Sequence, residues 1–156
     1  MGGAFRRGEA GAARGAVIAV VALAAAVAVG VVVSRGPGVT GAHDLALRDV
    51  QQHVDDIRAA ELTYMAAFEA WVFQPEPYPR AVEALDPNPV SFQWGSAFDD
   101  LGWAPEGDVA ATFQVVPDGD GFRVIGTIDA DGDGEPARFV ATRDRAAERE
   151  TPEGVF

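Results

Sequence analysis

The sequence predicts an α+β fold, with an N-terminal transmembrane helix followed by an amphipathic helix packed on a small antiparallel β-meander. Three observations lead to this prediction. Residues 15–33 form an apolar run without a charged side chain. Residues 44–73 place apolar side chains at alternating spacings of three and four, which is the periodicity of a helix with one buried face. Residues 111–142 contain three alternating runs separated by Asp-Gly turns, which is typical of β-hairpins.

The apolar run is long enough to cross a membrane as a helix. Its 19 residues span about 28 Å at about 1.5 Å per residue, close to the roughly 30 Å of a bilayer's hydrocarbon core. Three arginines precede the run and only Arg35 follows it closely. Because cytoplasmic flanks carry the excess of positive charge, we expect residues 1–14 to be cytoplasmic, residues 15–34 to span the membrane and the rest to be exported. The alternative is a cleaved signal peptide, whose apolar region usually runs about 7–15 residues.

The charge of the chain is divided between its two parts. Residues 1–42 carry four Arg and one Glu, a net charge of +3, whereas residues 43–156 carry eight Arg and 23 acidic residues, a net of −15, which together give −12. The acidic part would repel phosphates, so we expect no nucleic-acid partner. The chain has no Cys, which excludes disulfides, a thiol nucleophile and a cysteine-ligated metal.

A Gly- and Pro-containing hinge at residues 35–43 separates the span from the amphipathic helix. Asp44 is the expected N-cap of that helix, which we place at residues 44–73. Its apolar face comprises Leu47, Val50, Val54, Ile57, Tyr64, Phe68 and Trp71. Because three aromatic residues lie at the C-terminal end of this helix, we expect the core to lie there. One position of the apolar face is occupied by Glu61.

The segment after the helix is rich in proline. Five prolines between residues 74 and 90 argue against a helix or a central strand, so we expect an extended connector. Residues 91–94 have the composition of a short strand, and residues 98–107 are expected to form an ordered loop. The three strands are predicted at residues 111–116, 122–128 and 137–142. Residues 143–156 are mostly polar and are expected to trail loosely, which leaves a domain at residues 44–142.

The order of these elements, and four short motifs, resemble type IV pilins and pseudopilins. Residues 57–64 are similar to the end of a pilin's long helix, where an Ala-Glu pair precedes an aromatic residue. Three further motifs resemble pilin-like proteins of delta-proteobacterial type. Residues 101–107 resemble a loop of these proteins, residues 129–134 their aspartate-glycine hairpin, and residues 151–156 their C-terminal ending. The resemblance covers about residues 44–156. The N-terminus is atypical, because residues 8–17 lack the Gly-Phe processing site and the apolar run contains no Glu.

The resemblance implies a membrane-anchored structural subunit, a minor pilin or pseudopilin of a type IV pilus or type II secretion-like assembly. Its partners would be other pilin-like subunits or membrane helices. It would be a single-pass protein of the inner membrane, with the domain in the periplasm or at the cell surface. The alternative is a stand-alone, membrane-anchored periplasmic binding module. The sequence contains no catalytic constellation and no small-molecule site that we recognise, so we expect no enzyme.

Three carboxylates form the candidate metal site. Asp129, Asp131 and Asp133, followed by Gly134, match the first half of a calcium-binding loop. The full pattern requires a Glu at the position of Val140, so this is not an EF-hand. The resemblance adds an argument for a calcium site, because some pseudopilins bind calcium in their C-terminal loops. We favour a solvated turn with no cofactor and keep Ca²⁺ as the alternative.

Glu61 is the candidate assembly residue, because it interrupts the apolar face of the helix. We favour a position at the edge of that face, where the carboxylate reaches water or caps a backbone group. The alternative is a charge that pairs with an Arg of a neighbouring subunit. If Glu61 is buried, it needs a partner, since a buried unpaired carboxylate is costly. His43 and His53 are not at metal-ligand spacing and are expected at the surface.

Overall fold

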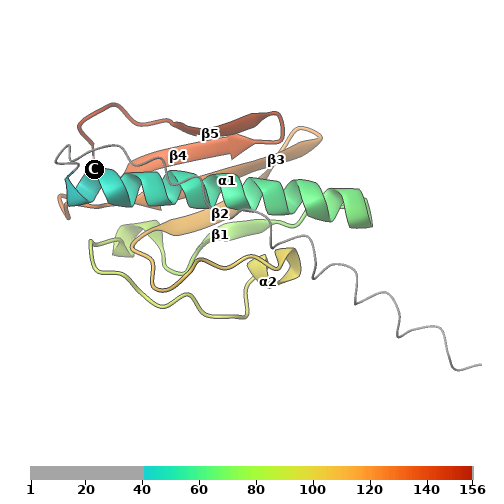
Figure 1. Cartoon of the computed structure of the whole chain (residues 1–156), viewed down its shortest axis with the longest axis horizontal. Helices are drawn as coiled ribbons and strands as arrows, with labels where there is room; N and C mark the ends of the chain where they lie inside the picture. Colours follow the sequence, from blue (N-terminus) through green and yellow to red (C-terminus); the bar gives the residue numbers. More distant parts are fainter. Residues whose placement is uncertain (1–40, 156) are drawn as a thin grey trace, which may run out of the picture. The chain divides into compact units, whose positions relative to one another are not determined.

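The computed structural model of the chain describes residues 41–155, which form a helix packed on a five-stranded antiparallel sheet (Figure 1). This confirms the α+β fold class. The assignments of residues 1–14 and 15–34, and most of the hinge at residues 35–43, lie outside the described residues. Within residues 41–155, no helix combines the length and the apolar character needed to span a membrane.

The helix α1 (Ala42–Phe68) begins slightly earlier and ends earlier than the sequence predicts. Its N-cap is Gly41, and Asp44 instead lies in the first turn, where a negative charge complements the helix dipole. The helix ends because Glu69 turns into the left-handed conformation at φ 56° and ψ 32°. The N–H of Glu69 then donates to the carbonyl oxygen of Met65 at 2.9 Å, as in a common type of helix C-terminus.

The buried face of α1 agrees with the predicted face only over its first four turns. Its buried residues are Leu47, Val50, Val54, Ile57 and Glu61. Tyr64 is partly exposed, the Phe68 side chain is 55% exposed, and Trp71 lies beyond the helix end. The expectation that the aromatic end of the helix forms the core is therefore wrong. The helix extends past the sheet residues that would cover that end, and the aromatic core is supplied by other elements.

The sheet is a simple meander in the order β1-β2-β3-β4-β5, with every neighbouring pair antiparallel. The strands are β1 (Gln74–Tyr78), β2 (Thr112–Asp118), β3 (Gly121–Ile128), β4 (Ala137–Thr142) and β5 (Arg145–Arg149). The three strands predicted from alternation correspond to β2, β3 and β4, which confirms them to within two residues at each end. Two further strands, one at each edge, were not predicted.

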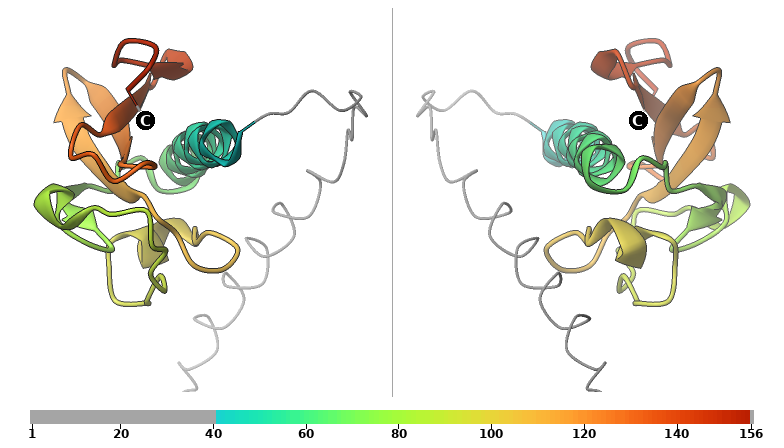
Figure 2. Two further views of the ribbon diagram at one scale, coloured as in Figure 1. Left: turned by 90° about the vertical axis from the view of Figure 1, so that its left-hand side faces the viewer. Right: turned by 90° about the vertical axis from the view of Figure 1, so that its right-hand side faces the viewer.

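The helix lies against one face of the sheet, which Figure 2 shows with α1 seen nearly end-on. The helix and the sheet approach each other closely at Gly126 in the middle of β3. A β-carbon at this position would lie 2.5 Å from a methyl group of Val54 and 2.9 Å from a methyl group of Val50. Both distances are shorter than van der Waals contact, so only glycine lets α1 sit this close to the sheet.

The expectation of a loosely trailing C-terminal tail is wrong for Arg145–Arg149, which forms the edge strand β5. The polar side of α1 holds this strand in place. The N–H of Ala147 donates to Asp55 Oδ1 at 2.7 Å, and its carbonyl oxygen accepts from Gln51 Nε2 at 2.8 Å. One turn further on, Arg58 Nε donates to the carbonyl oxygen of Thr142 at 2.7 Å. Side chains of the helix thus bond to backbone groups of the β4–β5 hairpin.

The proline-rich connector also contributes a strand, since β1 pairs with β2 at the other edge of the sheet. Proline is tolerated there because an edge strand leaves some of its N–H positions unpaired. No strand forms at residues 91–94, and only Val90 makes an isolated bridge, to Val109. The predicted ordered loop at residues 98–107 begins with the short helix α2 (Phe98–Leu101), and a single 3₁₀ turn, η2 (Val82–Ala84), lies in the connector.

Arg80 fastens the connector to the end of β2. Its guanidinium donates to the carbonyl oxygens of Asn88 at 2.8 Å and Ala110 at 3.0 Å, and the hydroxyl group of Thr112 donates to the carbonyl oxygen of Arg80 at 2.7 Å. These bonds give an otherwise irregular segment a fixed path. They place the following loop so that its aromatic residues can reach the core.

The aromatic core lies between α1, β2 and the long loop. Trp103 makes edge-on contacts with Phe98, Phe113 and Phe92, at ring-centroid distances of 5.3 to 5.5 Å. Phe98 and Phe113 are fully buried, and Trp103 is buried except for an edge. Edge-to-face packing at this distance is the preferred geometry for aromatic pairs. The cluster of Phe92 and Trp103 thus has a packing role.

Candidate functional sites

The three predicted metal-ligand residues lie together in the loop between β3 and β4. Asp129 follows the last residue of β3 and is buried, with 4% of its surface exposed. Both of its carboxylate oxygens accept backbone hydrogen bonds, from Gly132 at 2.8 Å and from Gly134 at 3.1 Å. Asp131 and Asp133 are exposed, and each accepts a bond from the N–H two residues further along the chain. Asp129 therefore folds the loop around its own carboxylate.

The same loop brings three carboxylates into ligand distance of one another. One oxygen each of Asp129, Asp131 and Asp133 lies within 4.8 Å of the other two. Asp131 also shares a shallow cavity with the first turn of α1, where Asp44 lies. A Ca²⁺ ion takes about six to eight oxygen ligands, so these residues offer half of a coordination sphere. The loop closes through its own backbone bonds, which is what a solvated turn requires.

Glu61 does not reach water, contrary to one part of our preferred interpretation. Its side chain is fully buried in the described domain. The other part of that interpretation, a cap on a backbone group, agrees with the structure. The N–H of Val72 donates to Glu61 Oε2 at 3.1 Å, whereas Oε1 has no hydrogen-bond partner. The carboxyl group thus bridges α1 and the segment that leads to β1.

The protonation of Glu61 follows from this position. Burial raises the pKa of Glu61 from 4.5 to about 7, and the hydrogen bond from Val72 lowers it by a smaller amount. Desolvation disfavours the charged form, and one N–H donor does not replace the water that a carboxylate loses. Near neutral pH, the protonated and ionised forms of Glu61 are both populated.

The two histidines differ in their surroundings. His43 is exposed, as expected, whereas His53 is only partly exposed, with its ring against the aromatic core. The His53 ring lies 5.9 Å from the Trp103 ring and 5.8 Å from the Phe113 ring, in edge-on geometry with both. Burial lowers the pKa of His53, while the carboxylates of Asp56 and Asp49 raise it by smaller amounts. His53 is a packing residue of the aromatic core.

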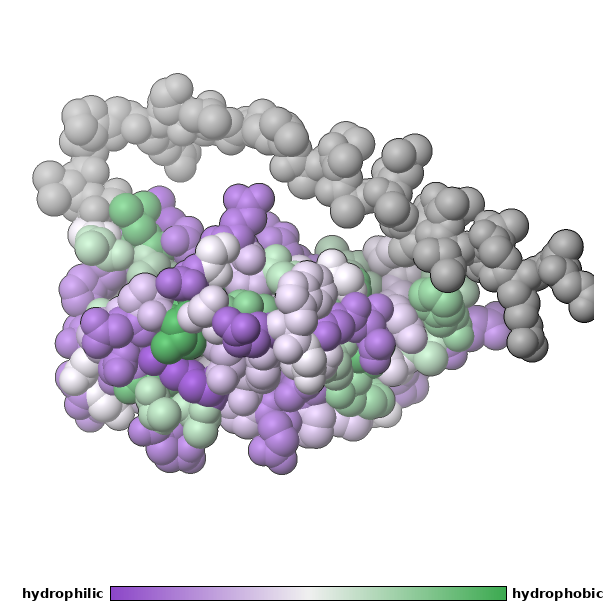
Figure 3. All heavy atoms as spheres, turned by 90° about the horizontal axis from the view of Figure 1, so that it is seen from below, coloured by the Kyte–Doolittle hydropathy of each residue, from purple (hydrophilic) through white to green (hydrophobic). Residues whose placement is uncertain are grey.

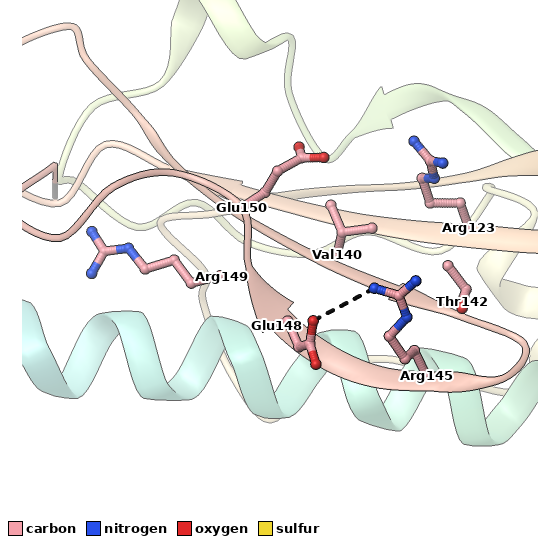
Figure 4. Close-up of a pocket in the computed structure, with 7 residues that line it drawn as sticks. All are labelled: Arg123, Val140, Thr142, Arg145, Glu148, Arg149 and Glu150. Atoms are coloured by element: carbon pink, nitrogen blue, oxygen red, sulfur yellow. Dashed lines mark ion pairs between the residues drawn. The ribbon is translucent and has the colours of Figure 1, made fainter.

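A shallow groove lies on the face of β3, β4 and β5 that α1 does not cover (Figure 4). Its lining comprises Arg123, Val140, Thr142, Arg145, Glu148, Arg149 and Glu150. Opposite charges lie close together here. Arg145 Nη1 is 3.8 Å from Glu148 Oε2, and Nη2 of the lining residue Arg123 is 3.4 Å from Oδ2 of Asp118, which does not line the groove. Both pairs are exposed. Exposed pairs of this kind contribute little to stability. Because positive and negative groups alternate, the groove favours neither anions nor cations.

The surface of the domain is mostly hydrophilic, with hydrophobic side chains in separate groups, as Figure 3 shows for one face. The large exposed apolar residues are Leu45, Phe68, Phe73 and Trp94. Trp94 is the most exposed, at 71%. Single exposed apolar residues are normal on soluble domains, so these side chains do not define a site by themselves.

The structure brings together only some of the residues that the sequence singled out. The three aspartates share one loop, whereas Glu61 lies on the helix and bonds to Val72. No feature of the sequence identifies Val72, because its role depends on a backbone N–H. Comparisons of the chain with protein-family models, with curated proteins and with solved structures gave no significant match.

Proposed function

We propose that this protein is a membrane-anchored structural subunit, a pilin-like protein of a type IV pilus or type II secretion-like assembly. The observation that carries the proposal is the order of elements along the chain. An apolar run at residues 15–33 is followed by the amphipathic helix α1 and then by a single antiparallel meander on which α1 packs. This is the order from which the resemblance to pilins and pseudopilins was inferred.

The character of the described domain supports a structural role. Several of its polar side chains are accounted for by folding: Asp129 closes a turn, Arg80 fastens the connector, and Gln51 and Asp55 bond to the edge strand β5. The two edges of the sheet carry devices that discourage pairing with another strand. They are the prolines of β1 and the side chains of α1 that bond to β5. Assembly would therefore use helix packing, with the acidic domain displayed outward.

The experiment that tests the anchor is membrane fractionation of the full-length protein in its native host. The proposal predicts that the protein stays in the pellet after washes with high salt and with carbonate. Replacing Ala24 and Val27 together by Arg places two charges in the apolar run, each costing roughly 2.5–3.5 kcal/mol at a span's centre. The double Arg variant should leave the membrane fraction. The matched control replaces the same two residues by Leu and should remain.

The structural role needs a second readout, since an anchor alone does not make a subunit. Presence of the protein in filaments sheared from the cell surface, or its crosslinking to other pilin-like proteins in the membrane, is the expected result. A protein that is anchored but never found with such partners would favour the stand-alone periplasmic binding module.

Calcium binding is the second candidate function, favoured by the three convergent carboxylates of Asp129, Asp131 and Asp133. A ligand that binds only the folded state raises the melting temperature. If the loop binds Ca²⁺, millimolar Ca²⁺ should raise the melting temperature more than Mg²⁺ does. A variant with Asp131→Asn and Asp133→Asn should lose this rise, while retaining Asp129 and its two backbone bonds. Equal melting temperatures with and without Ca²⁺ would establish the solvated turn.

A further inference from the structure

The junction between α1 and β1 is held by one buried side chain. Glu61 accepts a hydrogen bond from the N–H of Val72 at 3.1 Å through Oε2, and its second oxygen has no hydrogen-bond partner. The side chain has no exposed surface. This bond joins the last turns of the helix to the segment at residues 69–73, which leads into the sheet. Half of the hydrogen-bonding capacity of a buried acidic group is thus unused.

A hinge lies between the two partners of this bond. Glu69 has φ 56° and is the only non-glycine residue with a positive φ among residues 41–155. A side chain other than that of glycine is disfavoured in this conformation, and it persists where the surrounding structure holds it. The bond between Glu61 and Val72 is one of the contacts that hold the backbone on either side of Glu69, so its loss would ease a change of direction there.

The charged groups on the neighbouring elements have other partners or are exposed. Arg58, one turn before Glu61 on the same helix, donates to the carbonyl oxygen of Arg143 at 2.9 Å. Arg143 pairs with the carboxylate of Asp120 at 2.8 Å, and Glu69 on the connector is exposed. None of these groups forms an ion pair or a hydrogen bond with the Glu61 carboxyl group. An ionised Glu61 would therefore be stabilised by one backbone N–H alone.

We propose that the junction between α1 and β1 is a pH-sensitive latch: protonated Glu61 holds residues 69–73 against the domain, and loss of the proton releases them. The protonated carboxyl group keeps the bond from Val72 and carries no charge. The ionised group would be shielded from bulk solvent with a single protein donor, which favours a conformation in which it reaches solvent. The hinge at Glu69 provides the backbone freedom for that movement.

Opening of the latch would change the surface of the domain at the end of α1. Trp71 now packs on Phe122 at a ring-centroid distance of 4.9 Å, and its indole N–H donates to the carbonyl oxygen of Asp120 at 3.1 Å. Release of residues 69–73 would expose Trp71 beside the partly exposed rings of Tyr64 and Phe68, which already stack at 4.6 Å. The latch therefore controls how much aromatic surface the domain presents. This inference does not depend on the proposed anchor.

Hydrogen–deuterium exchange of the full-length protein in detergent micelles tests the latch. Exchange is followed by mass spectrometry from pH 5 to pH 8, with rates corrected for the intrinsic pH dependence of amide exchange. Because each unit of difference between the pKa of the closed and open states changes the equilibrium tenfold, the opening equilibrium should rise on the order of 100-fold. This rise is expected in peptides that cover residues 69–73. Peptides from β3 should remain better protected than residues 69–73 at every pH, since exchange in β3 requires unfolding of the whole domain.

The Glu61→Gln variant is the matched control, because it keeps an acceptor for the N–H of Val72 and cannot ionise. Its residues 69–73 should remain protected at every pH tested. Two results would overturn the proposal: constant protection of residues 69–73 in the native protein, or the same pH dependence in Glu61→Gln. Equal protection of β3 and residues 69–73 at each pH would also overturn it, since the two would then exchange together through global unfolding. The native-protein measurement stands even if the variant does not fold.

Discussion

Two buried carboxylates in this domain are held in opposite ways. Asp129 accepts a hydrogen bond on each of its oxygens from backbone N–H groups within its own loop. Glu61 accepts one bond, from a residue eleven positions away, and leaves its other oxygen without a partner. Burial alone therefore does not decide the role of an acidic residue. The number of donors decides whether the ionised group stabilises the fold or destabilises it.

The largest effect is expected at Asp129. Replacing Asp129 with Ala removes both acceptors and leaves two loop N–H groups to find new partners. At roughly 1.5–3 kcal/mol for each of the two bonds to a charged group, the free energy of unfolding should fall by roughly 3–6 kcal/mol. Urea denaturation of Asp129→Ala beside Asp129→Asn, which keeps one acceptor, measures this. If Asp129→Asn lost as much stability as Asp129→Ala, the charge of the carboxylate and not the number of hydrogen bonds would determine the stability of the loop.

The second effect has the opposite sign and depends on pH. The pKa of Glu61 is about 7 in the folded protein and 4.5 in the unfolded chain, so the folded state binds more protons between these values. Stability is fully present below pH 4.5 and is lost as the pH rises to about 7. Glu61→Gln should therefore be more stable than the native protein by about 3 kcal/mol at pH 8. Near pH 4.5 the two should differ little. Urea unfolding at both pH values checks the prediction, and equal stability at pH 8 would contradict it.

A smaller effect is expected at the hinge beside Glu61. Glu69 occupies a left-handed helix-ending position that favours glycine. Glu69→Gly should raise the free energy of unfolding by about 1 kcal/mol, since it relieves the backbone strain. Thermal unfolding beside Glu69→Ala, which keeps the strain and removes the carboxylate, separates backbone from charge. If Glu69→Ala gained as much stability as Glu69→Gly, the effect would come from removal of the negative charge and not from relief of backbone strain.

The smallest expected effect concerns a second titrating group, which has to be separated from Glu61. Burial lowers the pKa of His53 below 6.5, so the folded state binds fewer protons than the unfolded chain. Stability is therefore lost as the pH falls below 6.5, opposite in sign to Glu61 in the same range. In His53→Gln, the decline in stability from pH 4.5 to 7 that Glu61 causes should become steeper. An unchanged profile would show that His53 does not titrate in the folding transition.

The central part of the sheet was predictable from the sequence for a physical reason. Strands β2, β3 and β4 alternate apolar and polar residues because one face contacts α1, and Asp-Gly pairs mark their turns. The first turns of α1 were predictable in the same way, from residues that recur every three or four positions. In the first turns of α1 and in β4 the periodic pattern and the burial agree, whereas in the central strand β3 every residue except Arg123 is buried.

The edges of the sheet were not predictable by the same logic. The strand β5 consists of Arg, Ala and Glu residues, which favour helices, and it is held by side chains of α1 that lie about 90 residues away in the sequence. The strand β1 contains two prolines and pairs only because it lies at an edge. The partner of Glu61 was hidden for a related reason. The donor is a backbone N–H at Val72, which no side-chain pattern identifies.

The most direct test of the proposed function is the N-terminal sequence of the mature protein purified from its native membrane. A membrane-anchored subunit requires the apolar run at residues 15–33 to be retained. The account therefore predicts a mature N-terminus at or before Gly15, and a start between Gly3 and Gly15 would in addition indicate processing of the pilin type. A mature protein that starts near His43 would contradict the account, since the domain would then be released without its anchor.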